Sequence, residues 1–415
     1  MTSLYDCVVI GGGPAGILAA GQAAAAGARV LLCDKNRGIG RKLAITGKGR
    51  CNVTNDCPPD ELLKNVTGGH KFLYSAFSRF SAQDTMRFFE SLGVPLKTER
   101  GSRVFPVSDK AGDIVAALRR YLADLGAAFV SERVTGIRLS DGAVCGVETA
   151  RQFYPCAAAV VATGGRSYPA TGSTGDGYGF AEACGHRVTR LRPSLVSLDC
   201  PNPLCSACAG LTLKNVGIRL YENGRPVYSD FCELLFTHTG VSGPVVLSAS
   251  AHMRAESAEY ALEIDLKPAL DRETLDRRVL RDFEERRNKA VKNALDRLLP
   301  AALRAPLLAE TDIAPETPVN ALTRAQRASL VSAMKALRLS FLTPSGFDNA
   351  VVTAGGVALS EIDPKTMASK LAPGLYFAGE VLDLDAYTGG FNLQIAFSTG
   401  YAAGTAAAAY ALDRR

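Results

Sequence analysis

Three glycines and an aspartate near the start of the chain have the spacing of a dinucleotide-binding site. Gly11, Gly13 and Gly16 follow the pattern G-x-G-x-x-G, and Asp34 lies further along the chain. In that pattern the first glycine allows a tight turn, the second lets a diphosphate approach the backbone, and the third lets a helix pack against a strand. Pro14 stands where such a helix begins, and its missing N–H costs little there. The residue types predict that a diphosphate binds at the turn and that the acid binds ribose hydroxyls.

The elements that must position these residues are also predicted. The apolar run 7–10 indicates a strand buried on both faces, 18–26 an alanine-rich helix, and 30–33 a second strand that ends at Asp34. An ordinary turn between strand and helix would not need three glycines and an acid in register. The context therefore favours a dinucleotide site.

A glycine-rich, cationic segment, residues 37–55, follows the acid. It contains Arg41, Lys42, Arg50 and the run Gly47–Lys48–Gly49. A loop of this composition can present backbone N–H groups to a phosphate or to a flat ring, although a flexible basic surface loop has the same composition. Its position directly after Asp34 favours a role in cofactor binding.

The cysteines and the charge exclude several classes of protein. Cys51 and Cys57 could form a redox dithiol, but their spacing and the prolines after Cys57 favour Cys51 as a packing or cofactor-proximal thiol. Cys205 and Cys208 form one C-x-x-C pair without the second pair that a zinc site needs, so we expect no metal. A net charge of +6 without a uniform basic stripe does not favour nucleic acid as a partner. No signal peptide or membrane-spanning run is present, so we expect a cytoplasmic protein with reduced thiols.

Later segments predict that the nucleotide-binding domain is split. The apolar strand 158–162 ends in glycines, and so does the strand 375–378, after which Gly389 and Gly390 open a helix. Residues 191–266 show short strands with turns, 271–333 are helical, and 337–343 return to strand. We therefore expect an α/β fold with a Rossmann-like domain over 1–190 and 345–415, a β-barrel domain for the substrate over 191–270 and 334–344, and a small helical domain over 271–333.

Four longer motifs resemble the BaiN-type flavoproteins, a family of the two-dinucleotide-binding-domain type that includes aminoacetone oxidases and reductases of 3-oxo bile-acid intermediates. The motifs are GRKLAITGKGRCNVTN, LLFTHTGVSGP, VTAGGV and GLYFAGEVLDLDAYTGGFNLQIAFSTG. The resemblance runs nearly end to end. It implies an FAD-dependent oxidoreductase in which a β-barrel and a helical domain are inserted into the FAD-binding domain.

The resemblance also implies which residues bind FAD. It places the diphosphate at the first glycines, the adenosine ribose at Asp34, an adenine contact near Val134, and an acid near the ribityl chain at Glu380. We expect the N-terminus of the helix after Gly390 to point at one edge of the flavin ring. The expected cofactor-binding residues are Gly11, Gly13, Pro14, Ala15, Gly16, Asp34, Lys35, Arg41, Lys42, Gly49, Arg50, Cys51, Asn52, Val134, Thr163, Gly164, Gly379, Glu380, Asn392 and Leu393.

Three functions are compatible with these expectations. The first is NAD(P)H-dependent reduction of an activated C=C bond in a hydrophobic enone, such as a 3-oxo bile acid or a steroid. The second is oxidation of a small amine such as aminoacetone, with oxygen reduced to hydrogen peroxide. The third is a non-catalytic flavin-bound sensor or an RNA-associated protein. Because no second glycine fingerprint follows, we expect NAD(P)H to bind only transiently, and the candidate proton donors are Tyr387, His238 and Lys48.

Overall fold

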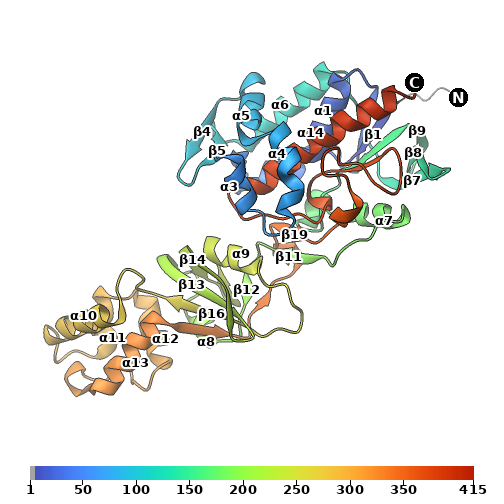
Figure 1. The fold of residues 1–415 in the computed structure, drawn as a ribbon. Helices are drawn as coiled ribbons and strands as arrows, with labels where there is room; N and C mark the ends of the chain where they lie inside the picture. Colours follow the sequence, from blue (N-terminus) through green and yellow to red (C-terminus); the bar gives the residue numbers. More distant parts are fainter. Residues whose placement is uncertain (1–4) are drawn as a thin grey trace. The chain divides into compact units, whose positions relative to one another are not determined.

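The computed structural model describes residues 5–415, which form two compact units (Figure 1). Unit 1 comprises the chain up to Ser194 together with Phe347–Arg415, and unit 2 comprises Leu195–Gly346. Both ends of the chain therefore build unit 1, and unit 2 is an insertion. This arrangement confirms the predicted α/β fold with a split Rossmann-like domain.

A parallel five-stranded sheet forms the centre of unit 1. Its order is β20 (Leu375–Phe377), β10 (Ala158–Val161), β1 (Cys7–Ile10), β2 (Val30–Asp34) and β6 (Ala128–Ser131). All side chains of β1, β10 and β20 are buried, as expected for strands covered on both faces. Because the strands are parallel, the turns after β1, β10 and β20 meet at one edge of the sheet.

The first and the last long helices of unit 1 lie side by side (Figure 1). They are α1 (Pro14–Ala25) and α14 (Phe391–Leu412). A Cβ atom on Gly400 would lie 2.3 Å from the Ala15 carbonyl oxygen, and one on Gly404 would lie 2.2 Å from that of Ala19. Glycines thus allow the two backbones to touch. Within residues 5–415, no helix has the length and the hydropathy that a membrane crossing requires.

Shorter elements surround this core. The cationic segment 37–55 is not a loop throughout, because Arg41–Gly49 forms helix α2, which loses helical geometry at Thr46–Lys48. Two antiparallel sheets (β3-β5-β4 and β7-β8-β9) and one strand pair (β11-β19) complete the strands. The other α-helices and strands of unit 1 are β3 (Thr54–Asn55), α3 (Pro59–Lys64), α4 (Tyr74–Arg79), α5 (Ala82–Ser91), β4 (Leu96–Glu99), β5 (Arg103–Pro106), α6 (Ala111–Asp124), β7 (Val134–Ser140), β8 (Ala143–Thr149), β9 (Phe153–Pro155), α7 (Asp176–Ala183), β11 (Arg192–Ser194) and β19 (Val352–Ala354).

Unit 2 contains an antiparallel seven-stranded sheet. Its order is β17 (Leu337–Ser340), β16 (Tyr260–Asp265), β13 (Thr212–Glu222), β14 (Arg225–Phe236), β15 (Gly240–Ser242), β12 (Leu198–Asp199) and β18 (Thr343–Pro344). Only Phe341 and Leu342 separate the first and last strands of this order. The two ends of the sheet must therefore lie close together, so the sheet is rolled, as a barrel requires.

The helices of unit 2 share one buried apolar cluster with this sheet. They are α8 (Pro203–Ala207), α9 (Pro244–Ser250), α10 (Arg272–Glu284), α11 (Val291–Ala294), α12 (Ala301–Ala309) and α13 (Arg324–Lys335). The division of this unit into separate β and helical domains stays a prediction.

Candidate cofactor site

The turn between β1 and α1 has the geometry that its glycines predict. Gly11 has a φ of +107°, and a Cβ atom there would lie 2.5 Å from the Ala162 carbonyl oxygen. A Cβ atom on Gly16 would lie 1.9 Å from the Gly11 carbonyl oxygen. At Gly13, by contrast, no described atom beyond its own chain neighbours lies within 4 Å of the Cβ position. The first and third glycines are thus required by packing, and the second leaves open space where a diphosphate would lie.

Asp34 braces this turn. Its carboxylate accepts hydrogen bonds from the N–H groups of Gly12 (2.6 Å) and Asn36 (2.7 Å), while the Gly12 carbonyl accepts one from the Gly40 N–H (2.7 Å). An ionised carboxylate can accept about four hydrogen bonds, so two positions are left. Contact with a ribose stays a prediction, and the bracing role is an addition that the sequence did not reveal.

Three buried polar atoms have no hydrogen-bond partner among the described residues. They are Asn52 Oδ1, Thr163 Oγ1 and the Tyr178 hydroxyl. Leaving such an atom unpaired lowers the free energy of unfolding by about 1–3 kcal/mol, so we expect a bound polar group to form the missing hydrogen bond. Asn52 and Thr163 are both among the predicted cofactor-binding residues, and together with the open space at Gly13 they fit FAD. Tyr178 was missed, although the glycine-rich run before it resembles a ligand loop.

Glu380 and Lys42, both predicted from the sequence, form one partly buried cluster. The Lys42 Nζ donates to Glu380 Oε2 (2.9 Å) and to Ser167 Oγ (2.7 Å). Glu380 Oε1 accepts from Ser167 Oγ (3.0 Å) and from the Thr353 N–H (2.8 Å). The cluster therefore ties α2, the segment after β10, β19 and the segment after β20 together at the carboxyl edge of the sheet. Ser167 and Thr353 were not anticipated.

The other predicted cations bind acidic or polar side chains of the protein. Arg41 donates to Asn36 Oδ1 (2.8 Å), and Lys35 donates to Asp176 Oδ2 (2.8 Å). Arg50 lies 4.0 Å over the Phe105 ring and pairs with Glu99 and Asp109. The Arg50 guanidinium holds the pKa of the Glu99 carboxyl below its usual value. In the structure, these three cations fix loops around the site.

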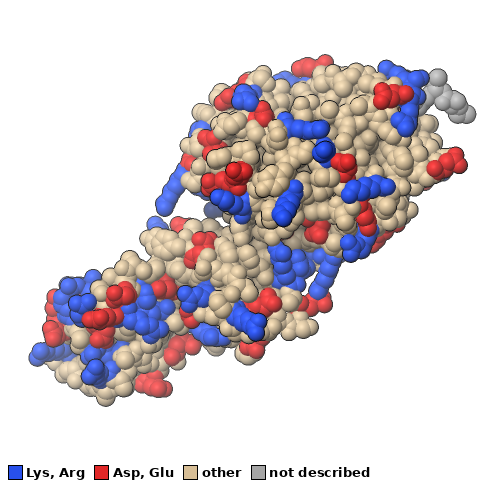
Figure 2. Space-filling view, in the orientation of Figure 1, with Lys and Arg blue, Asp and Glu red and all other residues tan. Residues whose placement is uncertain are grey.

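Charges of both signs are interspersed over the visible face of unit 1 (Figure 2). Several exposed cations form no ion pair with a described residue, namely Lys48, Lys64, Lys71 and Arg79. Tyr74 of α4, close in sequence to two of them, is 57% exposed. These side chains are available to an anionic partner, although they do not form a uniform basic stripe.

The segment that links α2 to β3 adopts an unusual backbone. Gly47, Lys48 and Cys51 have φ values of +57°, +59° and +61°. Left-handed conformations at residues with a side chain are uncommon and cluster at functional sites. The Cys51 thiol is fully buried, and burial raises its pKa to about 12, while burial raises that of Cys57 to about 11. Both thiols stay protonated at neutral pH, which supports the interpretation of Cys51 as a packing thiol.

The N-terminus of α14 packs against β3. Gly390 has a φ of +102°, and a Cβ atom there would lie 2.3 Å from the Thr54 carbonyl oxygen. The Gln394 N–H bonds back to Gly390, so the three N–H groups of 391–393 precede the first bond within the helix. Asn392 uses its side chain to bind the backbone of Ala386, at 2.9 and 2.7 Å. Its amide shapes the loop before the helix, and Leu393 is half-buried beside it.

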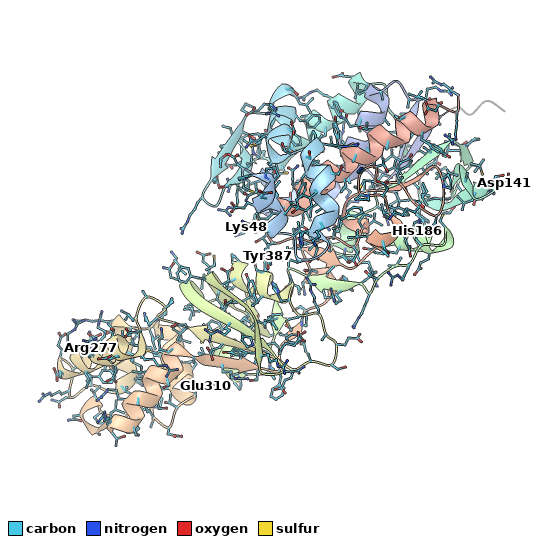
Figure 3. The ribbon with its side chains drawn as sticks, in the orientation of Figure 1. Lys48, Asp141, His186, Arg277, Glu310 and Tyr387 are labelled. Atoms are coloured by element: carbon cyan, nitrogen blue, oxygen red, sulfur yellow. The ribbon has the colours of Figure 1, made fainter. Side chains whose placement is uncertain are left out.

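The candidate proton donors do not all lie in one unit. Figure 3 labels Lys48, which is exposed, and Tyr387, whose N–H donates to the Asn65 carbonyl (3.0 Å); both belong to unit 1. His238 is exposed on the turn between β14 and β15 of unit 2.

The other predicted contacts lie in unit 1. Val134 begins β7 opposite Thr149. Gly164, with a φ of +73°, and Gly379, with a φ of +77°, follow β10 and β20 at the carboxyl edge.

Comparisons with known proteins agree with this architecture. The family model for the HI0933-like protein Rossmann domain matches residues 5–406. The 3-dehydro-bile acid delta(4,6)-reductase of Clostridium scindens is 33% identical over 411 residues, which cover 96% of this chain and 98% of the relative. The ribosomal RNA dihydrouridine synthase of Escherichia coli is 32% identical over 416 residues and 96% of each chain. The solved structure of 3-ketosteroid delta1-dehydrogenase from Sterolibacterium denitrificans has a TM-score of 0.52 at 13% identity over 98% of this chain and 99% of that one, which is a likeness of fold.

Proposed function

The chain belongs to the HI0933-like family of Rossmann-domain proteins and is an FAD-dependent oxidoreductase, and we propose that it reduces a C=C bond conjugated to a carbonyl. The proposed substrate is a hydrophobic enone, such as a 3-oxo bile acid or a steroid. The proposed electron donor is NADH or NADPH, bound transiently because the described residues contain a single strand–glycine turn–helix unit with the fingerprint.

One observation carries this proposal. Two full-length relatives with very different substrates are named for the same change in bonding. A delta(4,6)-reductase of a 3-dehydro bile acid saturates carbon–carbon double bonds, and a dihydrouridine synthase saturates the ring double bond of uridine. In both substrates a carbonyl is conjugated to the double bond, so it can accept the negative charge that develops when hydride is added to carbon.

The residues of this chain would hold the cofactor and direct the reaction. FAD supplies the hydride-transfer chemistry when it is bound. The open space at Gly13 would accept the diphosphate, and Asn52 and Thr163 would hydrogen-bond the cofactor with their unpaired oxygens. The N–H groups at the start of α14 and the helix dipole would favour negative charge on the bound ring. Tyr387, His238 or Lys48 would give the proton that completes reduction of the substrate carbon.

A uridine in RNA is the second candidate substrate. The E. coli relative supports it through its name, and exposed cations of unit 1 such as Lys48, Lys64, Lys71 and Arg79 support it through their charge. Lysine and arginine contacts to phosphates provide most of the affinity of RNA-binding proteins and weaken with salt. The same bond chemistry would then act on a base that RNA presents.

Anaerobic flavin spectroscopy distinguishes these functions. The holoenzyme would be mixed with NADH or NADPH, and then with a 3-oxo-Δ4 steroid, with ribosomal RNA or with uridine alone. Bleaching by the nicotinamide and recovery of the flavin spectrum by the steroid are the expected results. Recovery by RNA alone would favour the second candidate. Bleaching by aminoacetone but not by either nicotinamide would support the amine oxidase, and protein that binds no FAD would refute all three.

A further inference from the structure

Gln394 makes hydrogen bonds with both ends of its amide although it has no exposed surface. It lies four residues after Gly390, at the start of α14. Its Oε1 accepts from Thr54 Oγ1 (2.6 Å) and Thr85 Oγ1 (2.9 Å). Its Nε2 donates to the Phe80 carbonyl (3.0 Å) and to Ser398 Oγ (2.9 Å). Each polar atom of the amide thus has two partners, which is close to its full capacity.

These partners connect the start of α14 to the segment that contains Asn52. Thr54 belongs to β3, two residues after Asn52, and is itself fully buried. The next residue, Asn55, donates from Nδ2 to the Gly389 carbonyl (3.0 Å). Two adjacent side chains of β3 therefore hold the helix start, one through Gln394 and one through the residue before Gly390.

We propose that Gln394 is a positioning residue for the flavin, an inference that rests on the proposed binding of FAD. It fixes the separation between the N–H groups that begin α14 and the unpaired Oδ1 of Asn52. The N–H groups belong to the backbone at a helix end, and Asn52 follows Cys51, which has a left-handed backbone conformation. Asn52 Oδ1 has no partner among the described residues, so the positions of both groups depend on the elements around them.

A hydrogen-bonded amide suits this task better than an apolar side chain. Apolar packing tolerates small slips between elements, whereas four hydrogen bonds with defined directions allow one register of helix against strand. A displacement of about 1 Å at a reactive group can lower a rate by about a hundredfold. Full burial also shields the network from competition with water.

Two isosteric variants form the test. Thr54→Val and Thr85→Val each remove one hydroxyl donor to the same Gln394 Oε1, and both sites are fully buried. Only Thr54 lies on the segment that contains Asn52, since Thr85 lies on α5, where its hydroxyl is also 3.2 Å from the Ser81 carbonyl. The measurements are the melting temperature, the FAD dissociation constant and the flavin reduction potential of each holoenzyme.

We expect both variants to lower the melting temperature, but only Thr54→Val to weaken FAD binding, by about tenfold, and to shift the potential. Thr54→Ser keeps the hydroxyl and should retain the FAD affinity and the reduction potential of the parent. If Thr54→Val does not fold, Gln394→Met, which removes the whole amide at similar volume, gives the same comparison with Thr85→Val. Equal effects of the Thr54 and Thr85 variants on FAD binding and potential, or none, would overturn the inference. Wild-type protein that binds no FAD would instead refute the proposed function.

Discussion

At the scale of single residues, Gly16 is a position where a side chain would clash with the backbone. A Cβ atom there would lie 1.9 Å from the Gly11 carbonyl oxygen. This oxygen is a backbone atom, so it cannot move away as the end of a flexible side chain could. Gly16→Ala should therefore cost about 1–3 kcal/mol of unfolding free energy by overpacking and should abolish FAD binding. Denaturant unfolding and flavin retention on a desalting column measure the two effects.

Gly112→Ala is the matched control for that substitution. Gly112 lies in α6, and outside its own helix backbone and chain neighbours no described atom lies within 4 Å of its Cβ position. Alanine is favoured over glycine in helices by up to about 1 kcal/mol, so this variant should be as stable as the parent or more so. Equal destabilisation by the two variants would show that the close approach at Gly16 is not what requires glycine.

Cys51 should react with alkylating reagents more slowly than the half-buried Cys145 and Cys232. With a pKa of about 12, about one Cys51 in ten thousand is a thiolate at pH 8, and the sulfur is fully buried. Cys145 and Cys232 are half-buried and serve as internal references. Timed alkylation with iodoacetamide followed by peptide mass spectrometry should modify both references well before Cys51. Early modification of Cys51 in folded protein would contradict this prediction and would support a redox dithiol formed by Cys51 and Cys57.

The same thiol predicts how stability depends on pH. Burial raises the pKa of Cys51 in the folded protein above the value of 9.0 that an exposed thiol has. The folded state therefore holds this proton more tightly than the unfolded state does. The contribution to stability is complete below about pH 9 and is lost as the pH rises toward 12. Melting temperatures should fall across that interval, and less so in Cys51→Ala than in the parent.

At the scale of elements, the contact between α1 and α14 depends on small residues. A Cβ atom on Gly404 would lie 2.2 Å from the Ala19 carbonyl oxygen, so Gly404→Val should push the helices apart and lower stability by about 1–3 kcal/mol or more. Thr405→Val is the control, because Thr405 is the next residue and is exposed. Denaturant midpoints of the two variants provide the comparison, and a Gly404 variant as stable as its control would refute the role of close packing.

The elements also show what could be predicted from the sequence. The β1–α1 turn, the carboxyl-edge glycines and the helix after Gly390 were predictable because each depends on local patterns of glycine and apolar residues. Helix α2 was missed because Gly47 and Gly49 made the whole segment resemble a loop. The bonds from Lys42 and Ser167 to Glu380 were not predictable, since their partners lie 338 and 213 residues away and local patterns hold no information about such pairs.

At the scale of the whole molecule, unit 1 has its own sheet and its own apolar core, although it is built from two parts of the chain. Next to the insertion the two parts are joined where β11 pairs with β19, with Ser194 opposite Val352. We expect a chain in which a short glycine-serine linker replaces residues 195–346 to fold and to keep FAD. Because the proposed substrate domain is then absent, reduction of an enone should be lost. Size-exclusion chromatography with flavin absorbance tests retention, and a colourless, aggregated product would show that unit 1 depends on the insertion.

The pairing of α1 with α14 also has a consequence for synthesis of the chain. The fingerprint strand and helix leave the ribosome long before α14, the helix that packs against α1, has been made. At about 5–20 residues per second, the wait is on the order of 20 to 75 seconds. During that time unit 2 can complete its own core, whereas α1 presents an uncovered alanine face. An mRNA that is truncated before α14 would therefore yield a chain in which unit 2 is folded and the apolar surface of α1 is exposed. Chaperones and proteases recognise such a form.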